Sequence, residues 1–135
     1  MKVYIVRHGE VPHNVLKMYN NENEDLTDNG IMQALELRDK IKDIKFDMVI
    51  SSPLLRTIHT ENILTYYDDS IITDDRLSER DCGDLSGKPN ECTNREEYWN
   101  YYTEIQYGTS ESIQEFFKRV YNFLDELKAR DYECV

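Results

Sequence analysis

The amino-acid sequence predicts an α/β fold, a three-layer α/β/α sandwich built on a mostly parallel sheet. Three short runs rich in β-branched residues, near residues 2–7, 47–51 and 70–73, alternate with segments in which apolar residues recur at helical spacing. This alternation is typical of parallel strands with helices on both faces of the sheet. The whole chain, residues 1–135, is expected to form a single domain, since its length is that of a common domain.

The first run, Val3-Tyr4-Ile5-Val6, is followed directly by Arg7-His8-Gly9. Its β-branched residues suit a strand that is covered on both faces, as the strands of parallel sheets are. Gly9 allows the chain to turn where a side chain would obstruct it. Ligands of open α/β sheets bind beyond the carboxyl ends of the strands, so we expect Arg7 and His8 to face a ligand.

Two long helices have clear starts in the sequence. Thr27 is a suitable N-cap for a helix that runs to about Lys42, and Ser112 with Glu115 has the capping-box pattern at the start of the last helix. Apolar residues recur at helical spacing along that last helix, which indicates that it packs on the core. Residues 132–135 then begin what reads as a further strand.

The second predicted strand, Phe46–Ser51, leads into another helix. Pro53 suits the first turn of that helix, and Arg56 then lies within the same turn, near a strand end as Arg7 does. Two guanidinium groups at corresponding positions indicate a dianionic ligand, because each can bind phosphate oxygens through two hydrogen bonds.

A glycine-containing loop, residues 76–87, follows the third predicted strand and carries Glu79. Such loops are solvated surface in most proteins, but this one could hold a carboxylate over the crevice. A short helix is predicted for the aromatic residues Tyr98, Trp99, Tyr101 and Tyr102. Packing against the loop is the simpler interpretation of these rings, and a wall of a substrate pocket is the alternative.

Charge and hydropathy exclude several classes of partner. The chain has 16 basic and 27 acidic residues, a net charge of −11, without a dense basic cluster. Nucleic acids and anionic membranes need a basic patch, so neither is an expected partner. No stretch approaches the roughly 20 apolar residues of a membrane span, and no signal-peptide pattern precedes the first strand. A cytoplasmic protein is therefore expected.

Cysteines and histidines do not indicate a metal site. Cys82, Cys92 and Cys134 lack C-x-x-C spacing and are interpreted as free thiols. His8 and His13 lack the spacing of a helical histidine pair, and no carboxylate–histidine signature accompanies them. We therefore expect no metal.

Five motifs follow one another along the chain. They are Arg7-His8-Gly9-Glu10 with Asn14, Leu26-Thr27-x-x-Gly30-x-x-Gln33-Ala34, Ser51-Ser52-Pro53-Leu54-x-Arg56, Leu77-x-Glu79-x-x-x-Gly83-x-x-x-Gly87 and Glu111-Ser112. Together they resemble the histidine phosphatase superfamily, also called the phosphoglycerate mutase-like family. The five motifs span the chain and are jointly specific.

The resemblance implies an enzyme that needs no metal and no cofactor and acts on a small phosphorylated metabolite. His8 would accept the phosphoryl group and pass it to water or to another hydroxyl. Arg7, Arg56 and Asn14 would hold the phosphoryl oxygens, and Glu79 would protonate the leaving oxygen. This chemistry is physically sound, because fixed cations can hold the charge of the transferring group and a neutral imidazole attacks without first losing a proton.

The sequence departs from the family at several positions. Val11 stands where Thr or Ser is common, so a hydroxyl contact to phosphate is not expected. Thr57, His59 and Glu61 stand where Ala, Gln and Ala are usual. His59 is interpreted as a residue of the helix face and not as a catalytic residue.

The resemblance also implies a second histidine at the tip of a fourth strand, which lies between the first and the second strands. The sequence ends at Val135 as that strand begins. We therefore expect an incomplete catalytic domain, weakly active or inactive unless a continuation or a partner supplies the strand. Unpaired edges of the neighbouring strands would favour self-association.

Three functions remain open from the sequence. Phosphomonoester hydrolysis is favoured, because only 24 residues separate Gly87 from Glu111 and mutases of the family have a longer insertion there. A phosphoglycerate mutase-type phosphotransferase is the second. A non-catalytic module that binds phosphate or a partner is the third.

Overall fold

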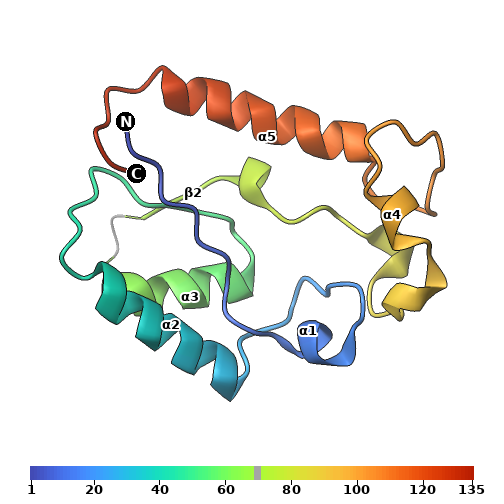
Figure 1. Cartoon of the computed structure of the whole chain (residues 1–135), viewed down its shortest axis with the longest axis horizontal. Helices are drawn as coiled ribbons and strands as arrows, with labels where there is room; N and C mark the ends of the chain where they lie inside the picture. The colour runs from blue at the N-terminus through green and yellow to red at the C-terminus, as the bar shows by residue number, and fades with distance from the viewer. Residues whose placement is uncertain (69–70) are drawn as a thin grey trace.

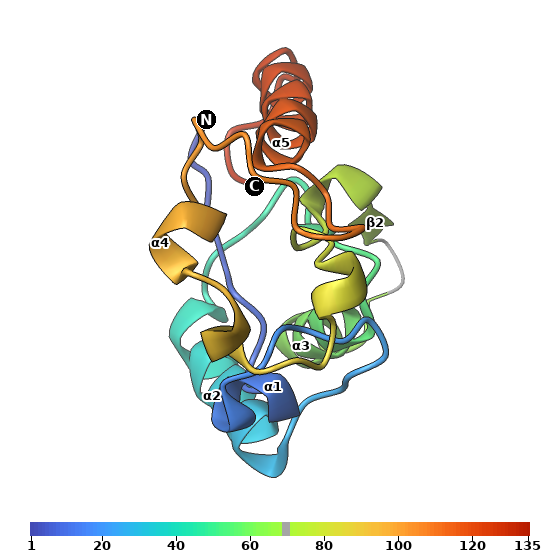
Figure 2. The same cartoon turned by 90° about the vertical axis from the view of Figure 1, so that its right-hand side faces the viewer.

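A computed structural model describes residues 1–68 and 71–135. Helix α5 (Ile113–Lys128) lies along one side of the molecule, and α2 (Asp28–Ile41) and α3 (Leu55–Thr65) lie together on the opposite side (Figures 1 and 2). Extended segments of the chain run between these two helical layers. The α/β fold predicted from the sequence is confirmed.

The sheet is smaller than the sequence indicates. Strand β1 (Ile50–Ser51) pairs with β2 (Ile72–Thr73), and the pairing is parallel, as predicted. The bonds from Ile72 N–H to Val49 O and from Asp74 N–H to Ser51 O complete this short ladder. Ser70, the first residue of the third predicted strand, lies outside the described residues.

The C-terminal residues lie between the first segment and the segment that leads into β1. Tyr4 N–H donates to Val135 O at 2.7 Å, and Asp47 N–H donates to Cys134 O at 2.9 Å. The Asp47 carboxylate also accepts from the N–H groups of Glu133 and Cys134, at 2.6 and 2.9 Å. Residues 133–135 therefore join the two segments through their backbone.

The prediction of a covered first strand at residues 2–7 is wrong. Among the described residues, its one regular pairing is a parallel bridge between Lys2 and Cys134. Within the part of the chain that the structure describes, the backbone beyond Tyr4 has no hydrogen-bonded neighbour until Gly9. Ile5 is 91% exposed, and the other apolar residues of this run are exposed as well.

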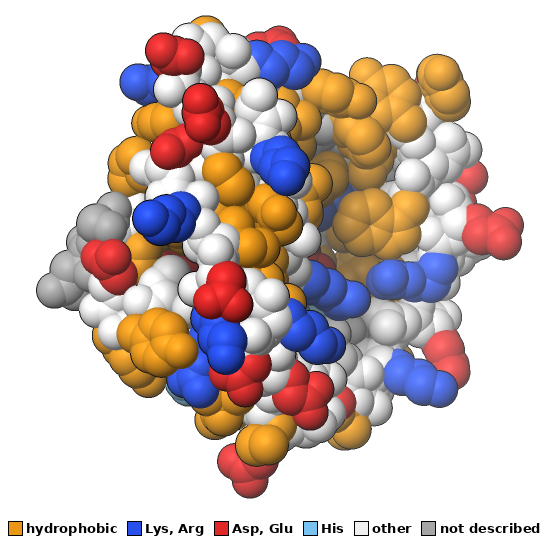
Figure 3. Space-filling model, turned by 60° about the vertical axis from the view of Figure 1, so that its left-hand side comes forward, with side chains coloured by type: hydrophobic (Ala, Val, Ile, Leu, Met, Phe, Trp, Pro, Cys, Tyr) orange, Lys and Arg blue, Asp and Glu red, His pale blue; other side chains and the backbone are white. Residues whose placement is uncertain are grey.

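One face of the molecule is hollowed, and hydrophobic side chains gather on both sides of the hollow (Figure 3). The apolar residues that are buried come from the helices and the loops between them, and not from the first segment. They are Val11, Tyr19, Ala34, Ile63, Cys82, Tyr98, Ile113, Phe123 and Leu127. The apolar start of the chain thus contributes to the surface and not to this core.

Both predicted helix starts are confirmed. The Thr27 hydroxyl accepts a hydrogen bond from Gly30 N–H at 3.1 Å, and α2 ends one residue before Lys42. Ser112 and Glu115 form the reciprocal capping box of α5. These starts depend on side chains within one helical turn, which is why the sequence alone reveals them.

Three other helical segments differ from expectation. Helix α3 begins at Leu55, so Pro53 precedes the helix, although Arg56 does lie in its first turn. Helix α1 (Pro12–Leu16) was not predicted, and α4 (Arg95–Tyr98) ends before most of the predicted aromatic helix. The cap residue Asn94 accepts from two N–H groups of α4, which sets the start of the helix at Arg95, three residues before Tyr98.

None of the helices in residues 1–68 and 71–135 is both long enough and apolar enough to cross a membrane. The three cysteines are free thiols, with Cys82 buried, Cys92 exposed and Cys134 between these extremes.

Candidate active site

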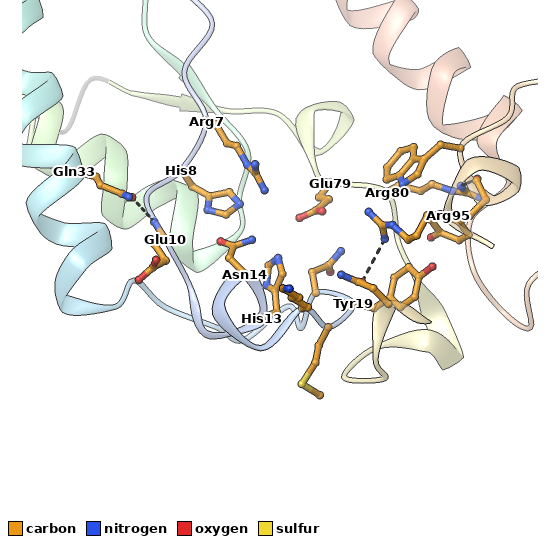
Figure 4. A pocket seen from close by; sticks show the side chains of 16 residues that line it. Arg7, His8, Glu10, His13, Asn14, Tyr19, Gln33, Glu79, Arg80 and Arg95 are labelled. Carbon is orange, nitrogen blue, oxygen red and sulfur yellow. Dashed lines mark hydrogen bonds between the residues drawn. The ribbon is translucent and has the colours of Figure 1, made fainter. Parts of the chain in front are cut away.

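His8 follows the exposed first segment and lines a cavity of about 550 Å³ (Figure 4). Its Nδ1 donates a 2.7 Å hydrogen bond to the carbonyl oxygen of Gly9, which leaves Nε2 with the lone pair of the neutral ring. Burial lowers the pKa of the His8 imidazole; the Gly9 bond opposes this, and the charges of Arg56 and Arg7 favour it. This shift favours the neutral imidazole at neutral pH, with the lone pair on Nε2.

Helix α2 fixes the backbone beside His8. A Cβ on Gly9 would lie 2.4 Å from the backbone oxygen of Gly30, so close approach, and not a turn, requires glycine here. Glu10 N–H donates to Gln33 Oε1 at 2.8 Å, and Thr27 N–H donates to Glu10 O at 2.9 Å. Three residues of this motif, Thr27, Gly30 and Gln33, thus hold the two residues that follow His8.

Arg56 and Glu79 form an ion pair beside His8. The Arg56 guanidinium is fully buried, and its Nη2 donates to Glu79 Oε2 at 2.9 Å. Its Nη1 donates to the carbonyl oxygen of Asn21 at 3.0 Å. The buried Nε of Arg56 has no hydrogen-bond partner among the described residues. The positive charge is therefore enclosed, while the carboxylate of Glu79 reaches the cavity wall.

Arg7, Asn14 and Glu79 line the cavity together with His8 (Figure 4). Asn14 uses its Oδ1 to accept from the Val11 N–H at 3.1 Å, so only its amide nitrogen is left for a ligand. The Val11 side chain is fully buried and offers no hydroxyl. The structure thus brings four predicted site residues to one cavity and ties Arg56 to them through Glu79.

Arg119 of α5 holds the loop that carries Glu79. Its Nη1 donates to Ser78 O at 2.7 Å, its Nη2 to Glu79 O at 3.2 Å, and its Nε to Glu111 Oε1 at 2.6 Å. The sequence motif that contains Glu111 drew attention to the start of α5. The sequence alone could not show that Glu111 bonds to Arg119 or that Arg119 contacts the Glu79 loop. Arg119 therefore acts as a positioning residue for Glu79.

The far wall of the cavity is aromatic and basic. The Arg80 guanidinium lies 3.9 Å from the centre of the Tyr98 ring and 5.6 Å from that of Trp99, and Arg95 lies on the same side (Figure 4). Lys17 also lines the cavity. Tyr98 is 1% exposed, so it both packs in the core and bounds the cavity. The two interpretations of the aromatic cluster therefore both hold for Tyr98.

Two histidine–carboxylate pairs were not foreseen. His13 lines the cavity, and its Nδ1 lies 2.5 Å from Glu24 Oε2. His59 of α3 makes a similar bond to Asp25, at 2.7 Å, on the outer surface. Both carboxylates lie in a polar stretch without periodicity, which gives no sequence signal for pairing. No group of three or more potential metal ligands occurs in the described parts of the chain.

Comparison with known proteins agrees with this geometry. Residues 3–134 match the model of the histidine phosphatase superfamily (branch 1). The chain is 32% identical over 120 residues to PhoE of Bacillus subtilis (strain 168), an uncharacterized phosphatase, and the match covers 87% of the chain and 60% of PhoE. It is 36% identical over 95 residues to the 2,3-bisphosphoglycerate-dependent phosphoglycerate mutase of Streptococcus mutans, covering 65% of the chain and 41% of the mutase.

A solved structure of similar fold is the α-ribazole phosphatase of Shigella flexneri. Its TM-score is 0.83 at 27% sequence identity, and the match covers 99% of this chain and 71% of that protein. The chain spans about 60% of the length of the Bacillus relative. The matched family model covers nearly every residue, and the site contains the histidine, arginines and acid of the family motifs. This chain belongs to the histidine phosphatase superfamily.

Proposed function

We propose that this protein hydrolyses small phosphomonoesters through a phosphohistidine formed on His8. The observation that carries the proposal is the state of the His8 ring: Nδ1 is bonded to Gly9 O, burial favours the neutral form, and Nε2 keeps its lone pair. A neutral nitrogen at the wall of a cavity can attack phosphorus without first losing a proton. The phosphatase and mutase relatives support the same reaction class.

The reaction would proceed in two steps. In the first, His8 Nε2 attacks phosphorus, the bond to the leaving oxygen breaks, and protonated Glu79 gives that oxygen its proton. In the second, water attacks phosphorus and gives a proton to Glu79, while the phosphorus–nitrogen bond breaks and its electron pair returns to Nε2. Microscopic reversibility assigns both proton transfers to one carboxyl group.

The arginines would supply the positive charge of the site. Arg7 lines the cavity, and the charge of Arg56 acts on His8 and on Glu79. Fixed cations stabilise the charge that spreads over the oxygens of a transferring phosphoryl group. A bound metal ion has this role in metal-dependent phosphatases. We therefore expect hydrolysis to need neither a metal nor a cofactor.

Trapping the intermediate tests the proposal directly. The protein is incubated with a labelled phosphomonoester and quenched in alkali, in which a phosphorus–nitrogen bond survives. We expect label on the wild type and none on His8→Ala, whereas His59→Ala, which changes a histidine outside the cavity, should keep the label. Label that persists in His8→Ala, or a rate restored only by added Mg²⁺ or Zn²⁺, would contradict the proposal.

A substrate panel separates hydrolysis from the alternatives. Release of inorganic phosphate from several phosphomonoesters supports a phosphatase. Interconversion of phosphoglycerates without net release would identify a mutase. Phosphate binding without any labelled enzyme would identify a non-catalytic module.

A further inference from the structure

The cavity contains a second imidazole that the proposed reaction does not use. His13 is buried, and its Nδ1 lies 2.5 Å from Glu24 Oε2. The other oxygen of Glu24 accepts from the backbone N–H of His13 at 3.0 Å. Because a carboxylate only accepts hydrogen bonds, Nδ1 of His13 carries a proton, and Nε2 is the one ring nitrogen left for a ligand.

His13 and His8 face the same space. Both line the cavity, and their ring centroids lie 6.3 Å apart at an interplanar angle of 63° (Figure 4). Each ring is held through Nδ1, by Glu24 in one case and by Gly9 O in the other, so each has Nε2 as its free nitrogen. A phosphoryl group bound to Nε2 of His8 would place its oxygens in the cavity. An oxygen within about 3 Å of Nε2 of His13 would form a hydrogen bond with that nitrogen.

The partners of the two rings differ in charge. His8 is bonded to a neutral carbonyl group, and the charges of Arg56, Glu79 and Arg7 act on it. His13 is bonded to a carboxylate, which holds the imidazole in one orientation. With both ring protons present, Nδ1–H donates to Glu24 and Nε2–H is left to donate to an anionic oxygen.

We infer that His13, oriented by Glu24, is a phosphoryl-binding residue of this site and donates from Nε2 to an oxygen of the group held by His8. The inference rests on the proposed function only in placing a phosphoryl group in this cavity. Glu24 is a positioning residue, since it touches His13 and not the ligand. This contact would give the phosphoryl group a further hydrogen-bond donor beside Asn14. The Oδ1 of Asn14 already accepts a hydrogen bond from Val11 N–H.

The chain provides a matched control. His59 and Asp25 form a pair of the same chemistry, with Nδ1 2.7 Å from Oδ1, but His59 does not line the cavity. Asparagine can place an amide nitrogen near the position of Nδ1 and has no counterpart of Nε2. His13→Asn therefore preserves the bond to Glu24 and removes the proposed contact, and His59→Asn makes the same change outside the site.

Binding of inorganic phosphate and of orthovanadate to the full chain tests the inference without requiring turnover. Calorimetry should show His13→Asn binding both anions about 10-fold or more weakly than wild type, the effect of losing one hydrogen bond to a charged group. Glu24→Gln, which keeps an acceptor but removes the charge, should weaken binding by a smaller factor. His59→Asn should bind as the wild type does.

A spectroscopic measurement on the wild type does not depend on how any variant folds. Nitrogen-15 resonances of the histidine rings are followed during titration with inorganic phosphate, and Nε2 of His13 should shift together with Nε2 of His8. Unshifted His13 resonances, no phosphate binding at all, or equal affinities of His13→Asn and His59→Asn would overturn the inference. Phosphate binding that depends on His13 in a protein that forms no phosphohistidine would overturn the proposed reaction alone.

Discussion

Arg56 Nη2 donates a 2.9 Å hydrogen bond to Glu79 Oε2, so the enclosed cation of the site is joined to the residue proposed as its acid. Removal of either partner leaves the other without its main contact. Loss of Glu79 would leave Nη2 of a fully buried guanidinium unpaired, in addition to its unpaired Nε. The pair therefore links the local stability of the site to the phosphoryl binding and the leaving-group protonation that we propose for these two residues.

Glu79→Gln keeps an oxygen that can accept from Arg56 but removes the transferable proton. We expect hydrolysis of an alkyl phosphate to fall by about 10²- to 10⁴-fold, the usual contribution of a general acid. The rate of phosphoryl transfer from p-nitrophenyl phosphate to His8 should fall much less, because the leaving oxygen of this substrate needs no proton. Single-turnover rates of phosphoenzyme formation on the two substrates check this, because the second step is common to both. Equal losses on both would argue against Glu79 as the acid, and Glu36→Gln, an exposed acid on α2, should change neither.

The pH dependence of phosphoenzyme formation should report His8. Burial lowers the pKa of this ring, and protonation removes the lone pair of Nε2. The rate should therefore be constant near neutral pH and fall as pH drops through a value below the ordinary histidine pKa of about 6.5. Single-turnover labelling across pH 4 to 8, roughly the titration range of histidine, measures it. An acid limb at or above about pH 6.5 would show that burial does not lower the pKa of the ring.

Gly30→Ala should destabilise the protein and the site together. A Cβ at this position would lie 2.2 Å from Glu10 O, a backbone atom that cannot move without shifting the chain beside His8. We expect a loss of about 1–3 kcal/mol in the free energy of unfolding, typical of overpacking, and a lower rate of labelling. Chemical denaturation measures the first effect. Asn29→Ala, one residue earlier and exposed, is the control and should show neither loss.

Glu61 should make stability depend on pH. Burial, with a contribution from Asp68, raises the pKa of the Glu61 carboxyl to about 7, and the value in the unfolded chain is about 4.3. Its contribution to stability is complete below about pH 4.3 and is lost as pH rises through about 7. Glu61→Gln should therefore raise the free energy of unfolding at pH 8 by about 2 kcal/mol and change little at pH 4. Thermal unfolding at both pH values, with Glu36→Gln as control, tests the sign.

The exposed first segment should promote self-association. We propose that copies of this chain contact one another through Val3–Val6, an apolar run whose backbone is largely unpaired and whose Ile5 is 91% exposed. Ile5→Lys should shift the sedimentation profile toward the monomer. Ile105→Lys, at a residue that is 54% exposed outside this run, should leave the profile unchanged. A wild-type chain that is monomeric at all concentrations would disprove the proposal.

Local chemistry made much of this protein predictable. The starts of α2 and α5 depend on Thr27, Ser112 and Glu115, each of which bonds within its own helical turn. Arg7, His8 and Arg56 were identified because each lies next to a predicted strand end, where ligands of α/β sheets bind. The α/β class itself followed from the alternation of strand and helix patterns.

Long-range packing decided the rest. The sequence shows that Val3–Val6 is apolar, but burial of a strand depends on its neighbours. In residues 1–68 and 71–135, no backbone hydrogen bond joins this run to a neighbouring strand beyond the pairing at Lys2 and Tyr4. The contacts of His13 with Glu24 and of Arg119 with the Glu79 loop join residues without periodic relation in the sequence. The residue types of the site could therefore be read from the chain, whereas the orientation of His8, the pairing of Arg56 with Glu79 and the second imidazole in the cavity depend on how distant segments pack.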